Sequence, residues 1–171
     1  MWPFNRKAAR ARDEPSVLGI SVARRTRGDQ DMTGSEAIYA AVSRISNTVS
    51  CIPVHLYREY ELQRDHPLER LVSFAPNERM TGYSFRNVME ACRNTSGNAY
   101  AIIVPSDGPA PASLDVLDPE RVTPYRERDT GDLWYQVMPD VGAGFWVHHS
   151  GMIVLRHTCT NGERGIRPLD V

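Results

Sequence analysis

Four residues in the last quarter of the chain carry side chains that can bind a metal ion. They are His148, His149, His157 and Cys159, and imidazole and thiolate groups together suit zinc. His148 and His149 are adjacent, however, and one residue separates His157 from Cys159, so the paired spacing of a zinc finger or ribbon is absent. We therefore expect these to be ordinary residues at strand ends, with no metal and no cofactor. A small metal-binding domain or enzyme that uses these four residues is the alternative.

Two glycine-rich stretches lack the rest of a phosphate-binding motif. Gly142-Ala143-Gly144 has no second half of a dinucleotide fingerprint and precedes an expected strand, and residues 161–165 have no Lys-Ser or Lys-Thr after them. Both are predicted to be loops. Paired carboxylates can perform acid and base catalysis, and three acids flank the predicted surface turn at Pro119: Asp115, Asp118 and Glu120. We expect no catalytic residue among them.

The three cysteines, Cys51, Cys92 and Cys159, are widely spaced and form no C-x-x-C pair. An odd number without a secretion signal argues against a disulfide framework. The prediction is three reduced, mostly buried thiols.

Charge is distributed unevenly along the chain. Of 171 residues, 41% are hydrophobic and 24% charged, which fits one soluble domain with a core of moderate size. Residues 1–27 hold seven basic and two acidic residues, a net charge of +5, so the remainder carries −6 of the total of −1. This start has few large apolar residues and is broken by Pro and Gly, so we predict a disordered basic arm over residues 1–33.

Basic arms bind phosphate groups, so a nucleic-acid-binding accessory protein acting through this arm is a further alternative. No apolar run is long enough for a signal-peptide core or a membrane span. We expect a soluble protein with no membrane partner.

The first part of the chain has the periodicity of helices. Thr33-Gly34-Ser35-Glu36 reads as a capping box, and an apolar stripe follows it until Pro53: Ile38, Val42, Ile45 and Val49. Residues 52–57 alternate and predict a half-buried strand. A short helix is expected from Pro67, with an end near Pro76 and Asn77.

The helix after Thr81 is the strongest prediction. Thr81 is the expected N-cap, and Gly97 stands where a left-handed C-terminal residue is needed. The apolar stripe between them is predicted to be core: Phe85, Val88, Met89 and Cys92.

From Asn98 onward short strands alternate with turn residues. We predict hairpins from residues 100–104 with 113–117 and from 122–128 with 133–138, followed by strands at 145–148 and 152–157. The predicted fold class is α+β, with N-terminal helices followed by a mostly antiparallel meander of short strands.

Six motifs in this order resemble the portal proteins of lambdoid, long-tailed bacteriophages. The resemblance runs from about Ser35 to the end. It consists of the helix and strand of residues 35–59, the His-Pro-Leu at 66–68, Pro76-Asn77 with Met80-Thr81, Gly97-Asn98-Ala99-Tyr100, the Asp-Pro-Glu-Arg-Val at 118–122, and His157 with residues 161–169. No single motif is decisive, and their order carries the resemblance.

The resemblance implies a structural subunit of the ring at one capsid vertex, through which double-stranded DNA is packaged and ejected. Residues 34–171 would form the wing, truncated before the stem, clip and crown. It further implies a dodecamer, contacts with the major capsid protein, the terminase large subunit and head-tail connector proteins, and a place in the virion after assembly in the host cytoplasm. A wing has no catalytic, cofactor or metal residues to assign.

Overall fold

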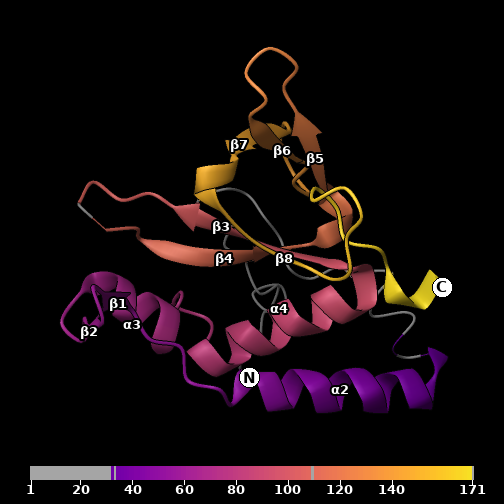
Figure 1. Ribbon diagram of the computed structural model, residues 1–171, viewed down its shortest axis with the longest axis horizontal. Helices are drawn as coiled ribbons and strands as arrows, with labels where there is room; N and C mark the ends of the chain where they lie inside the picture. Colours follow the sequence, from indigo (N-terminus) through magenta and orange to yellow (C-terminus); the bar gives the residue numbers. More distant parts are fainter. Residues whose placement is uncertain (1–31, 33, 109, 171) are drawn as a thin grey trace, which may run out of the picture.

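The computed structural model describes residues 32, 34–108 and 110–170, which form helices and antiparallel sheets in layers. Figure 1 shows helix α2 below helix α4, the sheet β4-β3-β8 above α4, and the sheet β5-β6-β7 above that. The predicted α+β class is confirmed. The predicted basic arm lies outside the described residues, apart from Met32. No helix in the described part of the chain combines the length and hydropathy needed to cross a bilayer.

Helix α2 (Glu36–Ser50) begins two residues later than the capping box predicts. Its N-cap is Ser35, whose hydroxyl accepts a hydrogen bond from the Ile38 amide at 3.5 Å. The helix is also rotated relative to the predicted stripe, since Ile45 is 45% exposed while Ser46 and Ser50 are buried. Small serine side chains on the contact face allow α2 to pack along α4.

The prediction of a strand at residues 52–57 is wrong. Only Tyr57–Arg58 (β1) is a strand, paired with Glu61–Leu62 (β2) through a tight turn at Glu59 and Tyr60, which have φ of 51° and 71°. Residues 52–55 are exposed. The Val54 carbonyl and the Leu56 amide bond to side chains of the next helix rather than to a neighbouring strand.

Helices α3 (Pro67–Ser73) and α4 (Gly82–Ser96) confirm the prediction. His66 caps α3, and the Thr81 hydroxyl caps α4 by accepting from the Ser84 amide at 3.1 Å. Gly97 ends α4 in the left-handed conformation, with φ of 76°. A β-carbon would be strained there, so glycine is required by the backbone alone.

The strands form two antiparallel sheets of three. The first has the order β4-β3-β8: β3 (Asn98–Val104), β4 (Ser113–Leu117) and β8 (Met152–Arg156). The second has the order β5-β6-β7: β5 (Val122–Arg126), β6 (Leu133–Val137) and β7 (Phe145–His148). Both predicted hairpins are confirmed. The predicted meander is not confirmed, because β8 pairs with β3 rather than with β7.

Three short 3-10 turns connect or follow these strands. They are η1 (Pro119–Arg121), η2 (His149–Gly151) and η3 (Pro168–Asp170). The expected turn at Pro119 is therefore confirmed as η1.

The core has two parts, one on each face of the sheet β4-β3-β8. Between the two sheets lie the buried residues Tyr100, Ile102, Val104, Leu117, Val122, Tyr135, Val137 and Met152. Between the first sheet and helices α3 and α4 lie Leu71, Phe85, Met89, Ala99, Ala101 and Leu114. Strand β3 is covered on both faces, so it is the central element of the fold.

Candidate assembly site

The end of α4 and the C-terminal segment (residues 157–170) are joined through one asparagine. The Asn98 carboxamide oxygen accepts from the Gly165 amide at 2.7 Å, and its NH₂ group donates to the Gly165 carbonyl at 3.1 Å. The His157 amide donates to the Gly97 carbonyl at 2.9 Å. Asn98 is 2% exposed, so these bonds satisfy backbone groups that water does not reach.

The two backbones approach so closely that neither has room for a side chain. A β-carbon on Gly165 would lie 2.1 Å from the Gly97 carbonyl oxygen, and one on Gly97 would lie 2.6 Å from the Ile166 carbonyl oxygen. The C-terminal segment is therefore in backbone contact with the turn that leads from α4 into β3.

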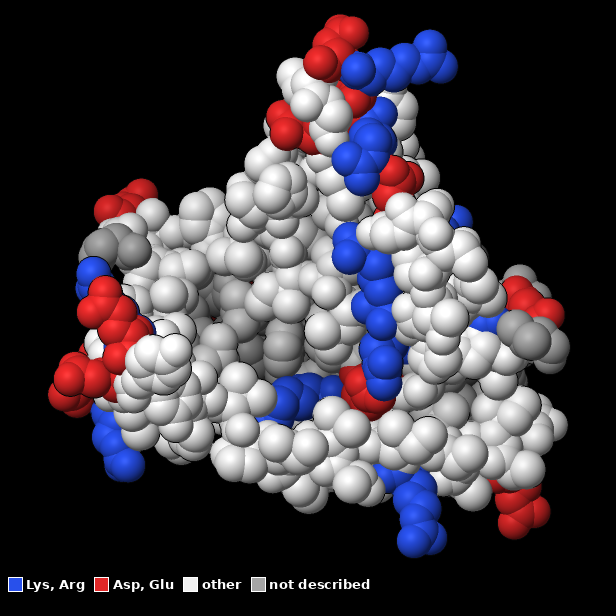
Figure 2. Space-filling view, in the orientation of Figure 1, with Lys and Arg blue, Asp and Glu red and all other residues white. Residues whose placement is uncertain are grey.

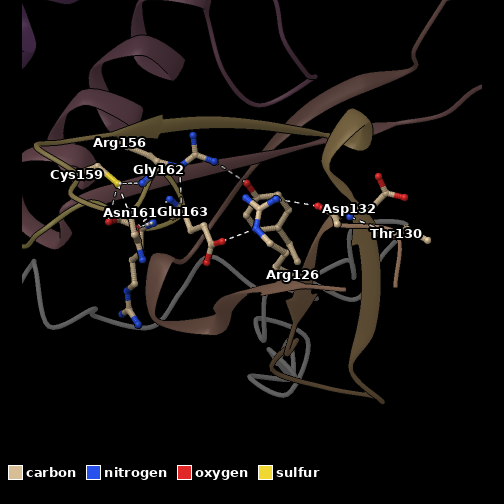
Figure 3. Close-up of polar contacts among 11 residues, drawn as sticks. Arg126, Thr130, Asp132, Arg156, Cys159, Asn161, Gly162 and Glu163 are labelled. Atoms are coloured by element: carbon tan, nitrogen blue, oxygen red, sulfur yellow. Dashed lines mark hydrogen bonds and ion pairs between the residues drawn. The ribbon is translucent and has the colours of Figure 1, made fainter. Parts of the chain in front are cut away.

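Arginines attach the same segment to both sheets (Figure 3). The Arg156 guanidinium donates to the Glu163 carbonyl at 3.0 Å and to the Tyr135 hydroxyl at 2.9 Å. Arg126, on β5, forms an ion pair with the Glu163 carboxylate at 2.5 Å. Arg167 donates to the Thr95 carbonyl at 2.9 Å. One short segment thus links α4, β8 and the hairpin β5-β6.

Cys159 organises the turn within this segment. Its Sγ accepts from the Gly162 amide at 3.1 Å and donates to the Arg164 carbonyl at 3.0 Å. All three cysteines are free, but the prediction that they are mostly buried is wrong, because Cys51 is exposed and Cys92 and Cys159 are half-buried. The turn predicted at residues 161–165 is confirmed.

The four candidate metal ligands are not brought together. His148 and His149 precede β8, with ring centroids 4.2 Å apart, and the His148 Nδ1 is bonded to the Ser150 hydroxyl at 2.8 Å. His157 and Cys159 follow β8, whose five residues span about 16 Å. Among the described residues, no three His, Cys, Asp or Glu side chains are placed to hold a metal ion.

A buried carboxylate fixes the extended segment before α3. Glu69 has a side chain only 5% exposed; its carboxylate contacts the His55 ring at 2.7 Å and accepts from the Leu56 amide at 2.5 Å. The Ser73 hydroxyl adds a contact at 2.8 Å and also donates to the Val54 carbonyl. The hydrogen bond with His55, followed by that from Leu56, lowers the pKa of Glu69 to about 2.

Two further titratable groups lie near the C-terminal segment. Burial would raise the pKa of Glu90, but hydrogen bonds from Arg93 and Asn94 outweigh it, and the pKa is lowered. Burial raises the pKa of Tyr100 to about 12, helped by the neighbouring Tyr135. The Tyr100 and Tyr135 rings pack edge to face, with centroids 5.7 Å apart. Hydrogen bonds and ring packing thus account for the surroundings of these groups.

The outward face of the sheet β5-β6-β7 is aromatic and uncharged. We call it the aromatic face; register places six side chains on it, namely Thr123, Tyr125, Trp134, Gln136, Trp146 and His148. The Tyr125 and Trp146 rings meet edge to face at 5.7 Å, and each residue is 51% exposed. Figure 2 shows, in one view, acidic and basic side chains at the projecting tips and a row of basic side chains down the middle of the molecule, with uncharged surface on both sides of that row. Exposed aromatic surface of this kind is typical of protein contacts.

A family model described as phage portal protein matches residues 36–171. The chain belongs to the phage portal protein family. A curated member, the portal protein of Enterobacteria phage HK97, is 28% identical over 81 residues, which are 44% of this chain and 19% of that protein. The matched stretch therefore spans about a fifth of the length of this portal protein.

Two solved structures contain chains with a fold similar to that of this chain. One is the neck of an empty gene transfer agent particle, computed with C6 symmetry, with a TM-score of 0.63, 17% identity, and coverage of 78% of this chain and 36% of that one. The other is the virion of a native gene transfer agent particle, with a TM-score of 0.62, 16% identity, and coverage of 88% and 42%.

Portal motifs noted in the sequence make hydrogen bonds within the fold, and two of them bond to each other. Pro76 and Asn77 bind β4. The Leu114 amide donates to the Pro76 carbonyl at 2.8 Å, and the Asn77 side-chain NH₂ group donates to the Leu114 carbonyl at 2.9 Å. The Gly97-Asn98 motif binds the last motif at Gly165. The sequence analysis did not predict that Glu69 is a buried acid or that Asn98 joins the start of β3 to the C-terminal segment. The one signal for Asn98 was its position within a portal motif.

Proposed function

We propose that this chain is the wing portion of a structural subunit of a phage portal ring, through which double-stranded DNA is packaged and ejected at one capsid vertex. The match of the family model to residues 36–171 carries the proposal. In this role residues 34–171 are one wing domain and residues 1–33 are an arm. The location is the virion, after assembly in the host cytoplasm.

The proposed work of the wing is contact rather than catalysis. Three polar clusters of the described residues consist of groups that bond to one another: Glu69 with His55 and Leu56, Asn98 with Gly165, and Glu163 with Arg126. A catalytic group needs free access to a substrate. We therefore assign no catalytic, cofactor or metal residue.

The proposed partners are further copies of the chain, in a dodecamer, together with the major capsid protein, the terminase large subunit and head-tail connector proteins. A closed ring needs two different contact surfaces on each subunit. The aromatic face is one candidate, since aromatic residues are enriched and charges depleted at the centres of protein interfaces. DNA in the channel would be a passing partner rather than one bound by this face, because phosphate contacts need basic side chains.

Light scattering across a concentration series, with negative-stain electron microscopy on the same sample, tests whether this portion carries subunit contacts. We expect a mass many times the 19.2 kDa of one chain, and ring-shaped particles. A mass that stays at 19.2 kDa at every concentration would contradict the proposal that the wing contributes subunit contacts.

A further inference from the structure

The edges of the two sheets differ in how they are protected. The outer edge of β4 is occupied at Leu114, whose amide donates to the Pro76 carbonyl and whose carbonyl accepts from the Asn77 side chain. The outer edge of β5 contains Pro124, which cannot donate a backbone hydrogen bond. Within residues 34–108 and 110–170, β7 pairs only with β6 and β8 only with β3. The edges of β7 and β8 are therefore the two open ones of the three-stranded sheets.

Of these two, β7 has the properties of a strand that accepts another. Its sequence, Phe-Trp-Val-His, contains neither Pro nor a Lys or Arg that would blunt an edge. Phe145 and Val147 point toward the core between the sheets but stay only half-buried, while Trp146 on the opposite side is exposed. An added strand with apolar residues on its inward side would extend the cover over Phe145 and Val147.

A segment outside the described residues has this pattern. Residues 18–22 read Leu-Gly-Ile-Ser-Val, so Leu18, Ile20 and Val22 fall on one side of an extended chain and Gly19 and Ser21 on the other. Such one-sided alternation fits a sheet with one buried and one exposed face, as in β5-β6-β7. It does not fit β4-β3-β8, which is covered on both faces.

We propose that residues 18–22 of a second copy of this chain pair with the open edge of β7 and extend the sheet β5-β6-β7 to four strands. This inference rests on the proposed ring and names one of its contacts. Main-chain hydrogen bonds would supply affinity, and the three inward side chains would set the register.

The layering of the molecule favours a second copy over the chain's own arm. The arm enters at the start of α2, whereas β7 lies beyond α4 and the sheet β4-β3-β8 (Figure 1). Three layer spacings of about 10 Å separate them in a straight line. Met32 and Gly34 are helical, so residues 23–31 set the reach of the linker, about 30 Å at most when fully extended. A path around the surface is longer than the straight line, so this linker would be too short or fully taut, which costs conformational entropy.

Exchange between neighbours also provides what a closed ring requires. Each copy would give an arm on one side and receive an arm at β7 on the other, so the contact uses two different surfaces and repeats around the ring.

Hydrogen–deuterium exchange on the full chain tests this pairing. The variant Leu18→Asp/Ile20→Asp places charges on the inward side, and Ser21→Asp/Ala23→Asp places the same charges on the outward side. In the wild type and the outward variant we expect amide exchange at 18–22 and 145–148 to be slowed by about tenfold relative to the inward variant. Equal exchange in all three proteins would overturn the proposal.

A mixing experiment separates exchange between copies from pairing within one chain. The inward variant, labelled with ¹⁵N, is unfolded and refolded together with unlabelled wild type. If arms are exchanged, wild-type arms pair with β7 of the labelled variant and slow its amide exchange. If β7 of the variant is not protected while β7 of the wild type is, the pairing is within one chain and the proposal is overturned. Rings that form equally well with the inward variant would also overturn it, while leaving the proposed function intact.

Discussion

Asn98 and Gly165 exchange two hydrogen bonds although 67 residues separate them in sequence. Both partners are buried, and the bonds join the start of the central strand to the C-terminal segment. The contact closes the fold around β3, since β8, the strand that leads into the C-terminal segment, pairs with β3 directly beside it.

Replacing Asn98 with Ala should lower the free energy of unfolding by about 1–3 kcal/mol, because the Gly165 amide and carbonyl would be left buried without a partner. Asn87→Ala is the matched control, since Asn87 bonds to Asn47 near the surface at 2.8 Å. Urea unfolding followed by circular dichroism measures both. Equal losses in the two variants would show that the buried bonds are not what stabilises this contact.

Gly165→Ala should cost about 1–3 kcal/mol by overpacking, because the new methyl group would lie 2.1 Å from the Gly97 carbonyl oxygen. Gly108→Ala is the control, since its β-carbon would meet only the Ser106 hydroxyl at 3.5 Å. Thermal unfolding and hydrogen exchange of residues 157–166 report the effect. A Gly165→Ala protein as stable and as protected as the control would mean that the segment can move away at no cost.

Glu69 should stabilise the protein in its ionised form. Its pKa is about 2 in the folded state and 4.5 ordinarily, so its contribution is fully present above pH 4.5 and is lost as the pH falls toward 2. Glu69→Gln should therefore be less stable than wild type at pH 7, and the difference should shrink as the pH falls through this window. Urea unfolding at several pH values measures it, with the exposed Glu61 changed to Gln as control. A difference independent of pH would exclude ionisation as the cause.

Tyr100 should resist ionisation at high pH. Its pKa is raised to about 12 by burial, so the neutral phenol contributes stability below pH 10 that is lost as the pH rises toward 12. Ultraviolet titration of the phenolate should show a late step that is missing in Tyr100→Phe. The same step should remain in Tyr60→Phe, which removes a 99% exposed ring. Loss of the step in the Tyr60 variant instead would contradict the assignment.

The ion pair between Arg126 and Glu163 should contribute little by itself. Their side chains are 51% and 29% exposed, and water screens pairs of this kind. A double-mutant cycle with Arg126→Ala and Glu163→Ala should give a coupling of about 0.2–1 kcal/mol that decreases in high salt. A coupling of several kcal/mol, insensitive to salt, would mean that the pair is desolvated in solution.

Local signals predicted much of this fold. Helix α4 was predicted with both caps, since Thr81 and Gly97 act on backbone groups within a few residues of themselves. The two hairpins were also predicted, because the turn residues and the alternating strands lie next to each other in sequence.

The errors arose where partners are distant in sequence. Residues 52–57 alternate like a strand, yet Glu69 and Ser73 take up their backbone groups from the next helix. Strand β8 returns to β3, and nothing within β8 itself specifies that partner. The burial of Glu69 could not be predicted, because its partners His55 and Leu56 lie 14 and 13 residues away. The aromatic face depends on the register of three strands and emerges only from the fold.

Helix α4 is held at both ends by backbone contacts without room for a side chain. At its start a β-carbon on Gly82 would lie 2.2 Å from the Ser73 carbonyl oxygen, and just beyond its end Gly97 meets Ile166. The 15 residues of α4 span about 22 Å. Adding or removing one residue would shift one end by about 1.5 Å and turn it by about 100° relative to the other. The helix therefore sets the distance between α3 and the C-terminal segment, and a change of one residue in its length would break one of these two contacts.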